Sequence, residues 1–98
     1  MIRVIIERRC LPGKEDELRN LIQEVRSDAV RRVGYITGET LRAADNPLHF
    51  MIISTWTTIE AWKVWESDRR KSFLIDGMMD SLLSEPEIVR IFVEEAPV

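Results

Sequence analysis

The chain has 98 residues, which is enough for one compact domain and too few for two. Hydrophobic residues make up 45% and charged residues 32%, as in globular rather than disordered proteins. The net charge of −3 argues against a nucleic-acid-binding protein, which needs a concentrated basic face, and no apolar run approaches the ~20 residues of a membrane span. A single cysteine and a single histidine leave no internal disulfide and no histidine-rich metal site.

The first half of the sequence predicts a strand followed by a helix. Residues 1–9 alternate, with Ile2, Val4 and Ile6 on one face, and the start is too short and too charged for a signal peptide. The breaker pair in Leu11-Pro12-Gly13 ends this strand, and a helix begins near Lys14. The helix carries one apolar stripe, formed by Leu18, Leu21, Ile22, Val25 and Ala29. Gly34 is a suitable stop after it.

A hairpin is predicted next. Residues 35–42 form its first strand, in which Gly38 indicates a bulge or a close approach by another group. A turn at Asp45-Asn46-Pro47 leads into a strand over residues 48–57. Both faces of this strand are largely apolar, so we expect it to be central and covered on both sides.

The remaining residues predict a helical region and a last strand. Thr58 is a helix cap, and the helical pattern continues to about Leu83, with a kink expected at Ser67-Asp68. Residues 88–95 alternate as a strand. The resulting order, β-α-β-β-α-β, predicts a single α+β domain over residues 1–98 with the ferredoxin-like fold, a four-stranded antiparallel sheet with helices on one face.

The other face of such a sheet would carry Ile and Val from several strands, which a chain of this size cannot leave in water. The simplest cover is a second copy packed sheet against sheet. We therefore expect a cytoplasmic homodimer with a barrel-like core, and neither nucleic acid nor a membrane as a partner.

Three segments together resemble the antibiotic biosynthesis monooxygenase (ABM) family, within the dimeric α+β barrel superfamily. They are Leu-Pro-Gly-Lys-Glu-Asp-Glu-Leu at 11–18, Gly-Tyr-Ile-Thr-Gly-Glu-Thr-Leu at 34–41, and Ser-Thr-Trp-Thr-Thr-Ile-Glu-Ala-Trp at 54–62 with Trp65, Ser67 and Arg70 behind it. The resemblance covers nearly the whole chain. It implies one of several activities: cofactor-independent oxidation of polycyclic phenols to quinones, quinol oxidation, haem degradation, or handling of a signalling sugar phosphate.

The haem-degrading branch is testable by position. In that branch an Asn lies on the first strand, a Trp lies in the second helical region, and a His ten residues later binds iron. Trp65 matches the Trp, but Glu7 stands at the Asn position and Ile75, which cannot bind iron, at the His position. His49 lies on a predicted strand and does not replace it. We therefore expect no haem and no other cofactor or metal.

Oxidation of a phenol without a cofactor requires a dry flat pocket, a base, and a donor that stabilises the phenolate. Trp65 is the strongest candidate, as a pocket wall whose indole N–H meets the substrate oxygen, although a Trp at helical spacing is often plain core. Arg69 continues the same helical stripe and is the candidate partner of an anionic substrate, or else part of a solvated basic run. Trp56 and Trp62 are interpreted as packing residues.

The base is a choice between Glu7 and His49. A buried Glu7 would have a raised pKa and could take a proton, but a salt bridge or exposure at the strand end is the simpler interpretation. His49 has the one side chain whose ordinary pKa lies near neutrality, and a hydrogen-bonded structural role is its simpler interpretation. Cys10 is interpreted as an inert small residue.

Two hypotheses from different classes remain. The first is a homodimeric, cofactor-independent monooxygenase acting on a phenolic or quinol-type aromatic, with Trp65, Glu7 or His49, and Arg69 in the roles above. The second is a dimer that binds a small aromatic or signalling metabolite without turnover. Haem binding is a third and weaker possibility.

Overall fold

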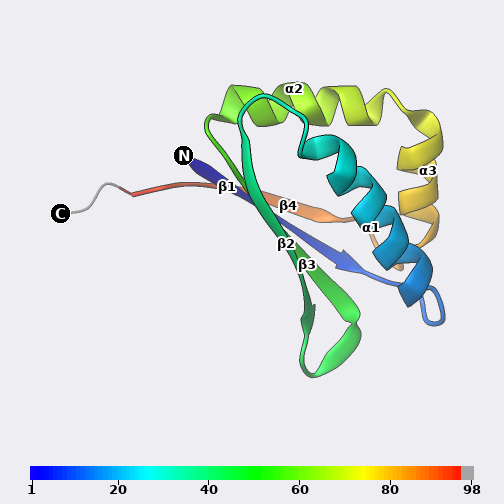
Figure 1. The fold of residues 1–98 in the computed structure, drawn as a ribbon. Helices are drawn as coiled ribbons and strands as arrows, with labels where there is room; N and C mark the ends of the chain where they lie inside the picture. The colour runs from blue at the N-terminus through cyan, green and yellow to red at the C-terminus, as the bar shows by residue number, and fades with distance from the viewer. Residues whose placement is uncertain (96–98) are drawn as a thin grey trace.

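A computed structural model describes residues 1–95, without the side chains of Phe73 and Leu74. The helices and strands, in chain order, are β1 (Ile2–Arg9), α1 (Glu15–Ala29), β2 (Tyr35–Ala43), β3 (Asn46–Trp56), α2 (Ile59–Arg70), α3 (Phe73–Ser81) and β4 (Ile88–Val93). The strands form one antiparallel sheet in the order β2-β3-β1-β4, and the helices lie on one face of it (Figure 1). The predicted ferredoxin-like α+β fold is therefore confirmed.

The strand register determines which side chains meet the helices. On the paired strands β1 and β3, Val4 lies opposite Ser54 and Arg8 opposite Phe50, and all four point toward the helices. The alternate positions, such as Ile5 opposite Ile53, point to the other face, which no described element covers. β3 is interior to the sheet, as expected, but within the described chain only one of its faces is covered.

The core consists of two adjoining clusters under the helices. One lies under the N-terminal half of α1 and includes Leu18, Leu21, Ile22, Phe50 and Met79. The other lies under α2 and includes Ile2, Val4, Trp56, Trp62 and Trp65. Val25 packs against both clusters, so the apolar stripe predicted for the first helix joins them.

The second helical region begins as predicted but breaks at a different place. Thr58 caps α2 by accepting the Ala61 N–H at 3.1 Å. The break falls at Lys71–Ser72, so the kink expected at Ser67–Asp68 is wrong. Asp68 does not cap a new helix, because its carboxylate instead accepts a hydrogen bond from Arg32 at 2.6 Å.

Strand boundaries differ slightly from the prediction. The hairpin turn consists of residues 44–45, and Asn46 already belongs to β3, where it pairs with Ala43. The last strand ends at Val93 rather than at Glu95. Within the described residues, no helix has both the length and the apolar character that a membrane crossing requires.

Two glycines are required by their surroundings. A Cβ on Gly38 would lie 2.5 Å from the Tyr35 hydroxyl, which confirms the close approach expected there. The strand irregularity lies earlier, between Tyr35 and Thr37, and Gly38 itself pairs with Ser54. Gly34 has φ +92°, in the left-handed region, and a Cβ there would lie 2.5 Å from the Ala61 Cβ.

We expect Gly34→Ala to destabilise the protein by about 2–3 kcal/mol, because backbone strain and a clash with α2 add together. Gly77→Ala is the matched control. Gly77 lies within α3 with no heavy atom near its missing Cβ, so the same change should stabilise by up to ~1 kcal/mol through helix propensity. Urea unfolding of both variants measures the difference, and equal midpoints would contradict this account.

Candidate functional site

A pocket lies between the sheet and helices α1 and α2. Its cavity volume is about 60 Å³, several times what one water needs. Its apolar wall comes from α1, β1, β3 and β4 and consists of Ile6, Ile22, Val25, Ala29, Ile52 and Val89. Four aromatic side chains complete it: Tyr35, Trp56, Trp62 and Trp65. Such a largely apolar hollow with a few polar groups is the usual form of a small-molecule site.

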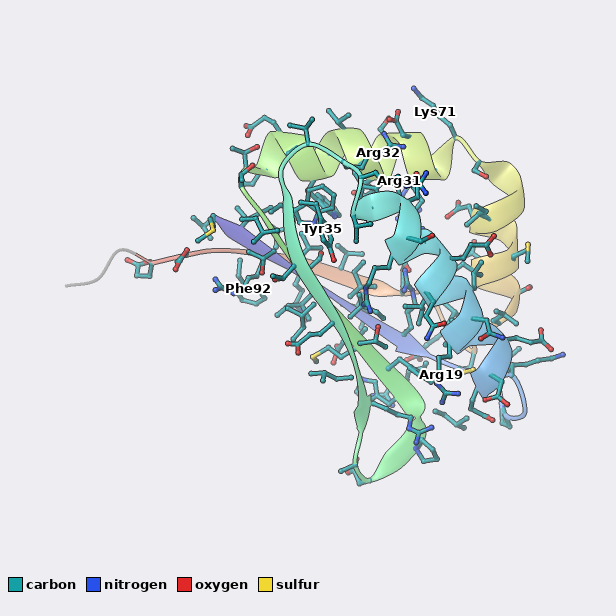
Figure 2. The ribbon with its side chains drawn as sticks, in the orientation of Figure 1. Arg19, Arg31, Arg32, Tyr35, Lys71 and Phe92 are labelled. Carbon is teal, nitrogen blue, oxygen red and sulfur yellow. The ribbon has the colours of Figure 1, made fainter. Side chains whose placement is uncertain are left out.

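Trp65 lies on the sheet-facing side of α2 and forms one wall of this pocket. Its residue exposure is 6%, and the guanidinium of Arg32 stacks over its ring at 5.1 Å from the centroid. Arg32 is in turn held by Asp68, so the indole is fixed from the side of α1's C-terminal end, where Figure 2 shows Arg32. The ring of Trp65 is therefore held in place as a wall of the pocket.

The other aromatic groups are fixed by one another. Trp56 donates its indole N–H to the Ser54 hydroxyl at 3.1 Å, and both residues line the pocket. The ring of Tyr35 meets Trp56 edge to face, with centroids 5.4 Å apart, in the space between sheet and helices (Figure 2). The close approach to Gly38 lets the Tyr35 hydroxyl lie along β2. Tyr35 thus lines the pocket from β2.

The charged part of the pocket consists of arginines. Arg8 on β1 and Arg69 on α2 both line it, with exposures of 3% and 8%. Arg8 donates to Glu87 at 2.8 Å, and an Arg69 Nη2 lies 3.6 Å from the same carboxylate. Burial opposes the charge of Glu87, but Arg8, Arg69 and Arg70 outweigh it and hold the pKa of this carboxyl below its ordinary value.

Two further polar residues reach the pocket. Arg26 on α1 donates to the Thr40 hydroxyl at 2.6 Å, and Glu66 on α2 accepts from Arg70 at 2.9 Å. Neither was singled out from the sequence, nor was Arg8. The alternation of β1 does place Arg8 on the same face as Ile2, Val4 and Ile6, so a signal for it was present.

Glu7 and His49 lie together on the opposite face of the sheet. Nε2 of His49 is 3.3 Å from Oε1 of Glu7 and has no hydrogen-bond partner among the described residues. Neither side chain lines the pocket between sheet and helices. The structure thus brings Trp65 and Arg69 together in one site and places the two candidate bases in a different one.

The described chain contains no cluster of metal-binding side chains. Residues 1–95 contain no group of three or more His, Cys, Asp or Glu side chains placed to hold a metal ion. Ile75 packs against the core, and its side chain offers no ligand to iron. Cys10 is 2% exposed, and burial, with a smaller effect of Glu15 and Glu17, raises the pKa of its thiol, which opposes thiolate chemistry.

Several solved structures share this fold. A conserved protein from Methanosarcina mazei has 17% identity and a TM-score of 0.86, covering 96% of this chain and 92% of its own. Rv0793 from Mycobacterium tuberculosis has 14% identity and a TM-score of 0.84, with 98% and 96% coverage. SnoaB from Streptomyces nogalater, a cofactor-independent oxygenase, has 14% identity and a TM-score of 0.80, with 99% and 96% coverage.

At these identities the structural likeness establishes the fold, and the family follows from the sequence. No curated protein matches the chain significantly. The family profile described as antibiotic biosynthesis monooxygenase matches residues 1–70, a span that contains β1 through α2 and most of the pocket's lining residues. The chain belongs to the antibiotic biosynthesis monooxygenase family.

Proposed function

We propose that the protein oxidises a small phenolic aromatic with dioxygen, without a cofactor, in the pocket beneath α2. The observation that carries this proposal is an apolar, aromatic-walled pocket that two buried residues of α2, Trp65 and Arg69, both line. In the reaction a phenol with an unsubstituted para carbon gains one oxygen atom and becomes a quinone. The other oxygen atom leaves as water together with the two hydrogens that the ring loses, so that atoms and electrons balance.

Each group has a limited task in this scheme. The substrate supplies the electrons, and it does so far more readily as a phenolate than as a phenol. The positive charges of Arg69 and Arg8 favour the phenolate and lower the phenol's pKa within the pocket. The Trp65 N–H donates to the phenolate oxygen, and the apolar wall limits the water around the carbon that reacts with dioxygen.

The step with the least support is removal of the phenol's proton, because no free base lies among the pocket's described lining residues. The pocket's one lining carboxylate, Glu66, is already bound to Arg70, and Glu7 and His49 lie on the opposite sheet face. This arrangement fits a mechanism in which the arginines make the phenol acidic enough to lose its proton to water. It equally favours the alternative function, in which the pocket binds a small aromatic and turns nothing over.

The experiment that separates the two uses 1,5-dihydroxynaphthalene as the probe. Incorporation of one oxygen atom gives 5-hydroxy-1,4-naphthoquinone and water, followed by quinone absorbance and an oxygen electrode. We expect protein-dependent oxygen consumption matched one to one by quinone, and no colour under nitrogen. Binding of the probe, seen as quenching of tryptophan fluorescence, without oxygen consumption would establish the binding alternative.

We also propose that a second copy covers the open sheet face. This face carries apolar side chains from all four strands, and Figure 2 shows Phe92 projecting from the side away from α1 and α2. The apolar side chains of this open face are Ile5, Leu41, Met51, Ile53, Ile88 and Phe92. Charged residues of both signs lie among these apolar side chains: Arg3, Glu7, Glu39 and Arg90. Such a mixture suits a surface that packs against its own copy.

Ile53→Glu is expected to give a monomer, because it places a charge in the middle of the apolar face, opposite Ile5. Val64→Glu is the matched control. Val64 is 61% exposed on α2, so the same change there should leave the assembly unaltered. Light scattering after gel filtration gives the mass, and a monomeric unmodified protein would contradict the proposal.

A further inference from the structure

Arg69 has a hydrogen-bond donor that the protein itself leaves unused. Its Nη1 is fully buried and has no acceptor among the described residues, and the nearest carboxylate oxygen, on Asp76, is 3.8 Å away. The side chain as a whole is 94% buried and lines the pocket. A buried guanidinium donor without an acceptor is costly, and a ligand that supplies one recovers that cost.

The charges around the pocket do not cancel. Its lining residues include Arg8, Arg26 and Arg69 against Glu66 alone. Glu87 compensates Arg8, and its lowered pKa keeps it ionised at neutral pH, while Arg26 has only the neutral Thr40 hydroxyl as its hydrogen-bond partner. When Arg70 and the Glu87 and Asp76 carboxylates that the arginines contact are also counted, one positive charge is in excess. It is enclosed by apolar and aromatic side chains that screen it poorly.

Trp65 and Arg69 are four residues apart on α2, one helical turn. Their side chains therefore emerge from the same face about 6 Å apart. That spacing is comparable to the length of a bicyclic aromatic ring system. A flat ligand that lies along the helix reaches the indole N–H with one edge and the guanidinium with the other.

We propose that the pocket's ligand is a hydroxyaromatic acid, whose carboxylate binds Arg69 while its phenolic oxygen lies at Trp65. The carboxylate supplies the acceptor that Nη1 lacks and neutralises the excess charge in a planar geometry that suits a guanidinium. This inference names the substrate class for the oxidation proposed above and shares its pocket, but the anion-binding claim stands on the geometry of Arg69 alone.

The test compares 2-naphthoate with 2-naphthamide, which have the same ring and shape and differ in charge. We expect the carboxylate to bind the unmodified protein about 10- to 100-fold more tightly, as measured by calorimetry at low salt. Arg69→Met, which conserves length, is expected to reduce this preference below about threefold. Arg69→Lys, which retains the charge, should keep part of it and serves if the first variant does not fold.

Arg31→Met is the matched control. Arg31 is exposed and does not line the pocket, so the preference should persist in this variant. Equal binding of the two ligands, a preference that survives Arg69→Met, or tighter binding of 2-naphthyl phosphate than of 2-naphthoate would each overturn the proposal.

The two proposals fail separately, because neither naphthalene probe has a hydroxyl to oxidise. A protein that prefers naphthoate through Arg69 and consumes no oxygen with any phenol keeps the anion site and loses the oxidation. A protein that oxidises 1,5-dihydroxynaphthalene and binds 2-naphthoate and 2-naphthamide equally supports the oxidation and contradicts the anion site.

Discussion

Trp65→Phe is expected to lower the rate of oxygen-dependent quinone formation by about 100-fold while the protein remains folded. The substitution keeps an aromatic wall but removes the N–H that stabilises the phenolate oxygen, and loss of one such donor from a preorganised site costs 10²–10³ in rate. The ring of Phe also loses part of the contact with Arg32, which stacks over the indole. Stopped-flow absorbance under saturating oxygen measures the rate, and circular dichroism melting checks the fold.

A second variant in the same pocket separates the effect of losing the Trp65 N–H on the rate from the effect of a smaller ring. Trp56→Phe makes the same reduction in size, but the Trp56 N–H already donates to Ser54, so a smaller loss of rate is expected. Anaerobic binding of the probe should weaken much less than the rate in Trp65→Phe, because the donor acts mainly on developing charge. Equal losses of rate in both variants would mean that Trp65 contributes only its bulk.

Periodicity predicted the fold because each element has a single strong pattern. β1 alternates and α1 carries one stripe, and both produced the expected burial, with Val4 and Leu18 fully buried. Alternation alone did not say which face of β1 meets the helices, since apolar side chains occupy both. The face of β1 that meets the helices decides whether Arg8 or Glu7 enters the pocket. Only the placement of the helices determines which face that is.

The contacts that complete the site join residues far apart in the sequence. Glu87, in the segment before β4, meets Arg8 across 79 positions, and no local pattern encodes such a pair. The helix break was misplaced for a similar reason, because Asp68 suits a helix cap locally but pairs with Arg32, in the segment that follows α1. Trp65 and Arg69 were found because they share one helix, on which a spacing of four fixes their mutual position.

Glu87→Gln is expected to destabilise the protein by about 3 kcal/mol at pH 7, and to lower Tm by roughly 12–24 °C. The reason is that Arg8, whose side chain is 4% exposed, would keep its charge in the core without its closest carboxylate. Glu85→Gln is the control two residues away. Its partner is Arg9 at 3.1 Å, both side chains are about half exposed, and its loss should cost no more than ~1 kcal/mol.

The pH dependence gives this ion pair a second signature. The folded state holds the pKa of Glu87 below its ordinary value of 4.5, so the stabilisation is complete above that pH and is lost as the pH falls through the lower, folded value. Below about pH 4.5 the unmodified protein should therefore lose stability faster than Glu87→Gln, and the difference in unfolding free energy between them should narrow. Urea unfolding from pH 7 to pH 3 measures it. A difference that stays constant with pH would show that the charge of Glu87 is not what stabilises the buried arginine.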